Sequence, residues 1–118
     1  DHFNPAKNIK GGVKYLSRMR DKFENVTDSI QRIKFTLGAF NCGAGHVFDA
    51  MRLAEKHGKD PTVWDDNVEE YILKLKSKKY YLDDVVKYGF MRGEEPYYYV
   101  KDIFKRYEHY KKFISLED

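Results

Sequence analysis

Cysteine is almost absent from this sequence, and the single residue, Cys42, excludes a disulfide framework and a cysteine-based metal site. The four histidines have no metal-ligand spacing such as H-x-x-x-H, so the sequence predicts neither a metal site nor a cofactor. No apolar run approaches the roughly 20 residues that cross a bilayer, and no signal peptide is recognisable. A mature or trimmed chain would look the same, so these absences do not indicate a compartment.

An excess of charge of one sign is also lacking, because 22 Lys and Arg residues face 19 Asp and Glu residues and leave a net charge of +3. A nucleic-acid-binding surface needs clustered basic residues. In this sequence they alternate with acidic and apolar residues, as on solvated helix faces, and the densest run, 74–79, is typical of an exposed surface. No nucleic-acid partner is therefore predicted, although a small basic helical nucleic-acid binder remains an alternative.

Tyrosine is abundant, with ten residues in a chain that is 16% aromatic. Its flat apolar ring and polar tip suit a half-wet groove that stacks on other rings. A single tyrosine more often seals the edge of a core, so both roles stay open for each residue. With 118 residues, 42% hydrophobic and 35% charged, the composition is that of one ordinary globular domain covering 1–118.

Alternating strand patterns and hairpin dipeptides are missing, and the apolar residues recur at helical spacing. The expected helices carry apolar stripes within 9–23, 30–40, 47–54, 68–75 and 100–107, and the last helix runs from Pro96 to about Ile114. Residues 78–90 are expected to be irregular or only briefly helical. The sequence therefore predicts a single all-α domain.

The ends of these helices carry recognisable signals. Caps are expected at Asn4 for the first helix, at Thr27 or Asp28 for the second, and at Asp65 or Asp66 for the fourth. Gly58 follows the third helix as a C-terminal stop. Gly11 and Gly12 lie inside the first stripe at a cost of about 1 kcal/mol each, which predicts close packing of another backbone against them.

Three blocks of sequence stand out by their order and spacing. The first is Asn8-Ile9, Gly12 and Tyr15-Leu16, the second is L-G-A-F-N-C-G-A-G-H-V from Leu37 to Val47, and the third holds Tyr88-Gly89-Phe90, Arg92-Gly93 and Glu95 to Val100. They resemble the N-I-x-x-G-x-x-Y-L, L-A-A-Y-N-A-G-P-G-x-V and P-Y-x-Y-V motifs of the lysozyme-like (SLT-type) peptidoglycan lytic transglycosylases. The stretch from Asp49 to Pro61 is similar to the membrane-bound lytic murein transglycosylase F subgroup.

This resemblance implies a lysozyme-like transglycosylase fold, present in part as a bundle of about five or six helices. It implies cleavage of the β-1,4 bond between N-acetylmuramic acid and N-acetylglucosamine without water, which gives 1,6-anhydromuramyl ends. The implied partners are peptidoglycan glycan strands of the bacterial cell envelope, in the periplasm or at the periplasmic face of the outer membrane. Contact with the membrane is expected only through other parts of the parent protein.

The family's catalytic residue is a glutamic acid in a Glu-Ser pair, which precedes a G-L-M-Q loop and the first block. This sequence contains neither the pair nor the loop. We therefore expect the carboxy-terminal portion of a catalytic domain, with the general acid upstream of residue 1 and no activity in isolation. The alternative is a related glycan-binding or scaffold module without catalysis. A face left uncovered by the absent helix would favour self-association.

The resemblance carries over six substrate-binding candidates: Asn41, Phe40, Gly43, Tyr99, Tyr97 and Glu95. Asn41 matches an asparagine beside the catalytic carboxyl, where an amide donates to and accepts from sugar groups. From the residues alone, capping the helix end is the simpler role. Tyr99 matches a tyrosine whose hydroxyl points toward that carboxyl, or else packs on the buried face of the last helix. Phe40 replaces the family's tyrosine and lacks its hydroxyl.

Two of the remaining positions have a simpler explanation than catalysis. Glu95 suits the positive end of the last helix dipole, besides matching a family glutamate. Cys42 behaves as a small hydrophobe. A nucleophilic Cys42 would need His46 as its base, and no third group is evident to orient that histidine, so a packing role is expected.

Overall fold

The computed structural model describes the backbone of residues 5–117 and the side chains of residues 12–109. All regular structure within this part of the chain is helical: α1 (Pro5–Asp21), α2 (Ser29–Cys42), α3 (Ala44–Lys56), the turn η1 (Trp64–Val68), α4 (Glu69–Lys74), α5 (Lys78–Tyr81) and α6 (Glu94–Glu117). The predicted all-α class is confirmed, as is the briefly helical segment at 78–90. The last helix is longer than predicted, because it includes Glu94 and Glu95 ahead of the proline.

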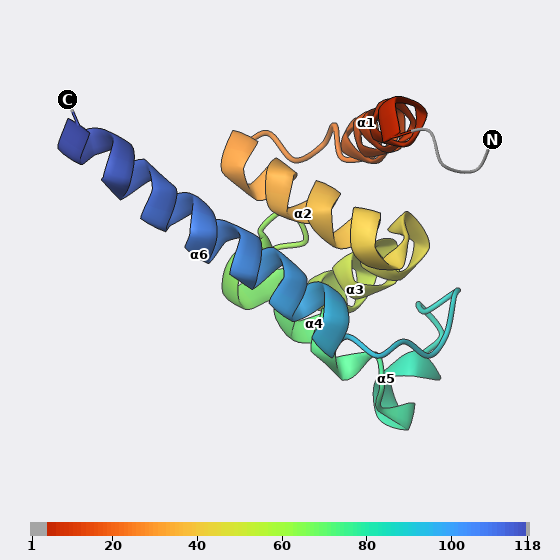
Figure 1. Ribbon diagram of the computed structural model, residues 1–118. Coiled ribbons are helices and arrows are strands. Elements are labelled where there is room, and N and C mark those ends of the chain that lie inside the picture. The colour runs from red at the N-terminus through yellow and green to blue at the C-terminus, as the bar shows by residue number, and fades with distance from the viewer. Residues whose placement is uncertain (1–4, 118) are drawn as a thin grey trace.

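α2 lies at the centre of the molecule (Figure 1) and packs against α1, α3, α6 and η1. α6 crosses α2 in roughly the opposite direction, so the end of α2 and the start of α6 lie at the same end of the molecule. The carboxy-terminal half of α6 extends past the other helices (Figure 1). No helix within residues 5–117 is both long and apolar enough to cross a membrane.

The core forms around Trp64, the only tryptophan, which is 1% exposed at the start of η1. Phe35 of α2 meets the indole edge to face at 5.4 Å, and the Phe23 ring lies tilted against Phe35 at 5.5 Å. A Cβ at Gly38 would lie 2.6 Å from the indole, so glycine lets the ring approach α2. Each such fully buried apolar side chain contributes roughly 1.5–3 kcal/mol.

Local signals predicted several helix ends correctly. Asp28 is the N-cap of α2 and accepts a hydrogen bond from the Gln31 N–H at 2.9 Å. α3 ends at Lys56 with His57 as its C-cap, and Gly58 follows with a φ of 79°. The expected cap at Asn4 lies outside the described residues.

The apolar stripes predicted for the first two helices are buried only in part: Met19 and Phe23 of the first stripe are 6% and 0% exposed, but other members are not buried. Val13 and Leu16 of the α1 stripe are 61% and 36% exposed, and Ile30 and Ile33 of the α2 stripe are 43% and 44% exposed. The buried face of α2 instead carries Phe35, Thr36, Gly38 and Ala39. The close packing expected at Gly12 is wrong, because nothing lies within 4 Å of a Cβ built there. Helical spacing marks an apolar face without determining what covers it.

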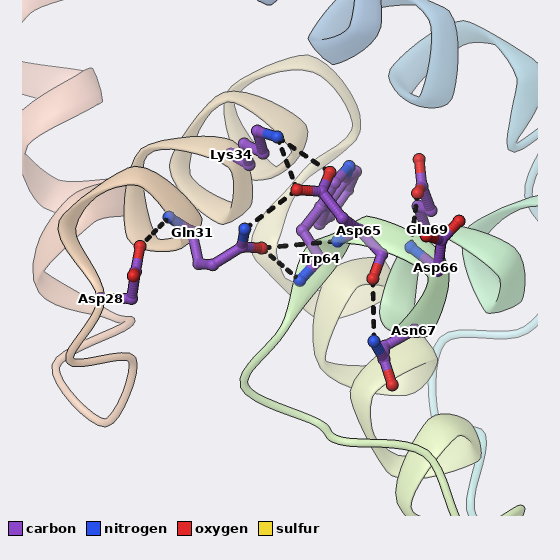
Figure 2. Close-up of polar contacts among 8 residues, drawn as sticks. All are labelled: Asp28, Gln31, Lys34, Trp64, Asp65, Asp66, Asn67 and Glu69. Atoms are coloured by element: carbon purple, nitrogen blue, oxygen red, sulfur yellow. Dashed lines mark hydrogen bonds and ion pairs between the residues drawn. The ribbon is translucent and has the colours of Figure 1, made fainter.

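A polar network joins α2 to the turn η1 (Figure 2). The Gln31 side-chain oxygen accepts the Trp64 N–H at 2.7 Å, and its amide nitrogen donates to Asp65 at 3.0 Å. Lys34 Nζ donates to both Asp65 oxygens, at 2.7 and 2.8 Å. Asp66 has a φ of 58° and donates its N–H to Glu69 Oε2 at 2.6 Å, so a predicted cap residue forms a strained turn instead.

Candidate functional site

Asn41 lies where the chain turns from α2 into α3. Gly43, with φ 93° and ψ 145°, closes α2 and opens α3, and its N–H donates to the Ala39 carbonyl at 2.7 Å. This φ strongly favours glycine, so Gly43 has a backbone role in the turn. The Asn41 side chain is exposed, and within residues 12–109 it makes no hydrogen bond that caps the helix. Asn41 is therefore an exposed residue whose side-chain amide, among residues 12–109, has no hydrogen-bond partner, and an amide can both donate and accept.

An apolar groove runs along the exposed face of α2. Between α1 and α2 it encloses about 300 Å³, and its lining is Val13, Leu16, Ser17, Arg20, Ile33, Thr36 and Leu37. Between α2 and α6 it encloses about 180 Å³, and its lining is Ile30, Ile33, Leu37, Ile103, Phe104 and Tyr107. Ile33 and Leu37 line both hollows, so the two lie next to each other on α2, one against α1 and the other against α6, and together they are called the groove below.

Phe40 lies on this same face, near the end of α2. It follows Ile33 and Leu37 at helical spacing and is 37% exposed. Its ring meets that of Tyr15 from α1 at a centroid distance of 5.6 Å. The pair joins α1 to the end of α2, where Asn41 is the next residue.

The helical phase of α6 separates its candidates into two groups. Glu95 and Tyr99 precede Ile103 by eight and four residues, so they share the face that borders the groove. Glu95 is exposed and Tyr99 is half-buried. α6 therefore carries Glu95 and Tyr99 toward the end of the groove at which α2 presents Phe40 and Asn41.

Tyr97 lies on a different face of α6. Its hydroxyl accepts a hydrogen bond from Lys101 Nζ at 2.6 Å, and the same ammonium lies 4.4 Å from the ring centroid. Lys101 in turn lines a second, smaller pocket of about 110 Å³ together with Lys34, Trp64, Asp65, Glu69, Val100 and Phe104, and Phe104 separates this pocket from the groove. The structure thus places Tyr97 apart from Tyr99.

Each charged side chain around this small pocket has a hydrogen-bond partner. Burial opposes ionisation of Asp65, but hydrogen bonds from Lys34 and Gln31 keep its pKa below the ordinary value. The hydrogen bond to Tyr97 raises the pKa of Lys101. Within the described residues, no three His, Cys, Asp or Glu side chains come together as metal ligands.

Cys42 is unsuited to nucleophilic chemistry. Burial raises the pKa of its thiol to about 12, so the reactive thiolate is scarce at neutral pH. The Sγ atom lies 3.6 Å from the Gly43 carbonyl oxygen, a weak contact within the turn. The expected packing role agrees with this environment.

The sequence patterns indicated no functional role for Asp49, for Arg52 or for the aromatic ring of Tyr88. Asp49 is fully buried, and Tyr88 is held against Gly45 at the same α2–α3 junction. One signal was available in the sequence: a carboxylate inside the apolar stripe of α3, with an arginine three residues later.

Comparison with protein families identifies the class that these features define. The model of the family described as transglycosylase SLT domain matches residues 1–63, which is more than half of the chain. The chain therefore belongs to the transglycosylase SLT domain family, and the resemblance noted in its three sequence blocks is confirmed.

Individual relatives are more specific. Membrane-bound lytic murein transglycosylase F of Vibrio cholerae is 37% identical over 108 residues, covering 92% of this chain and 20% of the relative. The proteins of the same name from Desulfosudis oleivorans and Shewanella frigidimarina are 36% and 38% identical over 92% of this chain, covering 23% and 22% of their own lengths. This chain thus spans about a fifth of the length of the curated relatives that it matches.

Proposed function

We propose that this chain is the carboxy-terminal portion of the catalytic domain of a peptidoglycan lytic transglycosylase. In this proposal the parent protein cleaves the β-1,4 bond between N-acetylmuramic acid and N-acetylglucosamine in the bacterial cell envelope, on its periplasmic side. The 118 residues supply part of the substrate-binding surface, beyond the Asn41 end of the groove, and the general acid comes from outside them. The observation that carries the proposal is family membership together with the exposed Asn41 amide at the end of an apolar groove.

The groove along α2 is the proposed seat of the segment that carries the acid. Five apolar residues on its walls and floor are more than a third exposed: Val13, Leu16, Ile30, Ile33 and Tyr107. Contiguous exposed apolar surface marks a place where another segment packs. An acid seated there would lie in low-dielectric surroundings, which raise the pKa of a carboxyl and keep it protonated near neutral pH.

The proposed chemistry needs only one carboxyl, because the substrate brings its own nucleophile. The acid gives its proton to the leaving glycosidic oxygen, and its carboxylate then accepts the proton of the muramyl 6-hydroxyl as that oxygen bonds to the anomeric carbon. Ordinary glycosidases need a second carboxylate for water or for a covalent intermediate. The chain's own part is to orient the sugar, with the Asn41 amide donating and accepting hydrogen bonds and the Tyr99 hydroxyl near the acid.

The proposal is tested on purified sacculi with the full-length product of the gene and with the 118-residue chain. We expect 1,6-anhydromuropeptides, identified by mass spectrometry, from the full-length protein and none from the chain alone. Asn41→Ala in the full-length protein should lower kcat/KM roughly tenfold to a hundredfold, because one oriented polar group is lost. Asn25→Ala is the matched control, since Asn25 is an exposed asparagine in the loop between α1 and α2.

Three results would count against the proposal. Muropeptides with reducing ends would indicate hydrolysis instead of transglycosylation. Anhydro products from the 118-residue chain would place the acid within it. Glycan binding by a full-length protein that releases no product would favour the non-catalytic module.

A further inference from the structure

Asp49 is a charged side chain in the middle of the core, with no exposed surface. Its Oδ1 accepts the Lys87 N–H at 2.8 Å and also pairs with Arg52, while its Oδ2 accepts the Tyr88 N–H at 2.9 Å. Arg52 Nε donates to the Val85 carbonyl at 2.8 Å. A buried carboxylate is costly unless it is paired and fully hydrogen-bonded. These contacts offset that cost, and those to Val85, Lys87 and Tyr88 hold the segment that precedes α6.

The irregular segment from Leu82 to Gly93 is held at other places as well. Asp83 Oδ1 accepts the Val85 N–H at 3.0 Å, and Asp83 pairs with Lys56 of α3 at 2.8 Å. The Met91 N–H donates to the Leu75 carbonyl at 3.2 Å. The segment is therefore ordered against α3 and α4 before any ligand arrives, although little of it is helical.

Tyr88 lies over the first turn of α3. A Cβ built on Gly45 would lie 2.9 Å from three atoms of the Tyr88 ring, so only glycine permits this position. The ring also meets His46 at a centroid distance of 6.4 Å, and Tyr88 is nevertheless 62% exposed. The segment thus lies against the start of α3, and Gly45 follows Asn41 by four residues.

We infer that Tyr88 is a further glycan-binding residue, a ring on which a pyranose stacks beyond the Asn41 end of the groove, and that Asp49 and Arg52 are its positioning residues. The π face of an aromatic ring is electronegative and apolar, which suits the C–H face of a sugar. A ring that is fixed before binding loses little conformational entropy when the sugar arrives. The inference rests on the proposed function, because it adds a subsite to the same groove.

The test uses the full-length protein and peptide-free glycan strands prepared from sacculi. Tyr88→Ala should raise KM about tenfold and change kcat by less than about twofold, because stacking away from the scissile bond stabilises substrate and transition state alike. Tyr88→Phe keeps the ring and should stay within about twofold of the wild type. Leu82→Ala is the control, since Leu82 is an apolar residue of the same segment that is 71% exposed.

The position of the Tyr88 ring is tested separately from its presence. Gly45→Ala displaces the Tyr88 ring and leaves the Asp49 contacts in place, so it should raise KM as Tyr88→Ala does without lowering the thermal midpoint. Asp49→Asn turns one carboxylate oxygen into an amide donor facing an N–H, which should release the segment and raise KM. Arg52→Lys keeps the charge but should retain only part of the wild-type affinity. Lysine lacks the planar fork with which Arg52 reaches both Asp49 and the Val85 carbonyl.

The outcomes separate this inference from the proposed function. An unchanged KM in Tyr88→Ala, or an equal loss in Tyr88→Phe and Tyr88→Ala, overturns the stacking role. If the wild-type protein binds the strands but forms no anhydro product, the proposed function fails, and the same variants are compared by dissociation constant. If the wild-type protein does not bind the strands at all, both ideas are refuted.

Discussion

Replacing Gly93 with alanine tests a close approach between the start of α6 and the backbone of α4. A Cβ at this position would lie 1.8 Å from the Ile72 carbonyl oxygen and 2.9 Å from the Leu73 Cα atom. Both are backbone atoms of α4, so no side-chain rotation relieves the clash. An ordinary C···O contact is about 3.3 Å, and restoring it requires the start of α6 to move away from α4 by roughly 1.5 Å.

The cost follows from what that movement separates. Ile72, Leu75 and Val100 are 0–2% exposed at this contact, and loosening their packing leaves voids that the rigid backbone cannot fill. Overpacking alone costs about 1–3 kcal/mol. With the added loss of packing we expect the unfolding free energy to fall by at least about 3 kcal/mol. This is a large share of the roughly 5–15 kcal/mol by which a domain is stable. The thermal midpoint should fall by roughly 12 °C.

Urea and thermal unfolding followed by circular dichroism measure this effect, and Gly12→Ala provides the matched control. Gly12 lies inside α1 with nothing within 4 Å of its missing Cβ, so alanine there should stabilise the chain by about 1 kcal/mol through helix propensity. The same glycine-to-alanine change should therefore lower the unfolding free energy at Gly93 and raise it at Gly12. A Gly93→Ala variant within about 0.5 kcal/mol of the wild type would show that α4 and α6 are not in backbone contact.

Three further predictions concern the polar contacts. Gln31→Ala leaves the Trp64 N–H without its 2.7 Å acceptor, which should lower the unfolding free energy by about 1–3 kcal/mol in urea titrations; an unchanged urea midpoint would contradict the role of this bridge. Asp66→Gly relieves a φ of 58° and should raise the unfolding free energy by about 0.5 kcal/mol after the entropy cost of glycine, which differential scanning calorimetry can resolve; a loss would mean that the aspartate side chain stabilises the turn. The hydrogen bond from Lys56 lowers the pKa of Asp83 from 3.8 to about 2, so the stability it contributes is present above pH 3.8 and is lost as pH falls toward 2. Asp83→Asn should flatten the stability curve in that window of urea unfolding experiments, and an unaltered acid slope would refute the assignment.

Local chemistry was sufficient to predict most helix ends and one complete buried face. Asp28 caps α2, and Gly58 follows the end of α3, because these signals act on neighbouring backbone atoms only. On α3 the predicted stripe, including Val47 and Ala54, is buried throughout. A short helix that packs against the core has a single apolar face, so the spacing of its apolar residues identifies the buried side directly.

The faces of α1 and α2 could not be predicted in the same way. α2 is apolar around much of its circumference, so its pattern allowed more than one orientation. The packing of Phe35 and Gly38 on Trp64 selects the buried side and leaves Ile33 in the open groove. That selection depends on a contact between residues 26 or more positions apart, which no local window contains.

For the site, the sequence by itself determined the chemistry that is available: an amide at a glycine turn, a block that resembles a known family, and tyrosines near the last helix. Only the tertiary structure decided which of these act together. The helical phase of α6 places Tyr99 on the groove side and Tyr97 on another face. Asp49 accepts a hydrogen bond from the Tyr88 N–H, although the two residues are 39 positions apart in the sequence. The physical reason is that helix phase and buried hydrogen bonds arise from the packing of whole elements, whereas caps and turns arise from adjacent residues.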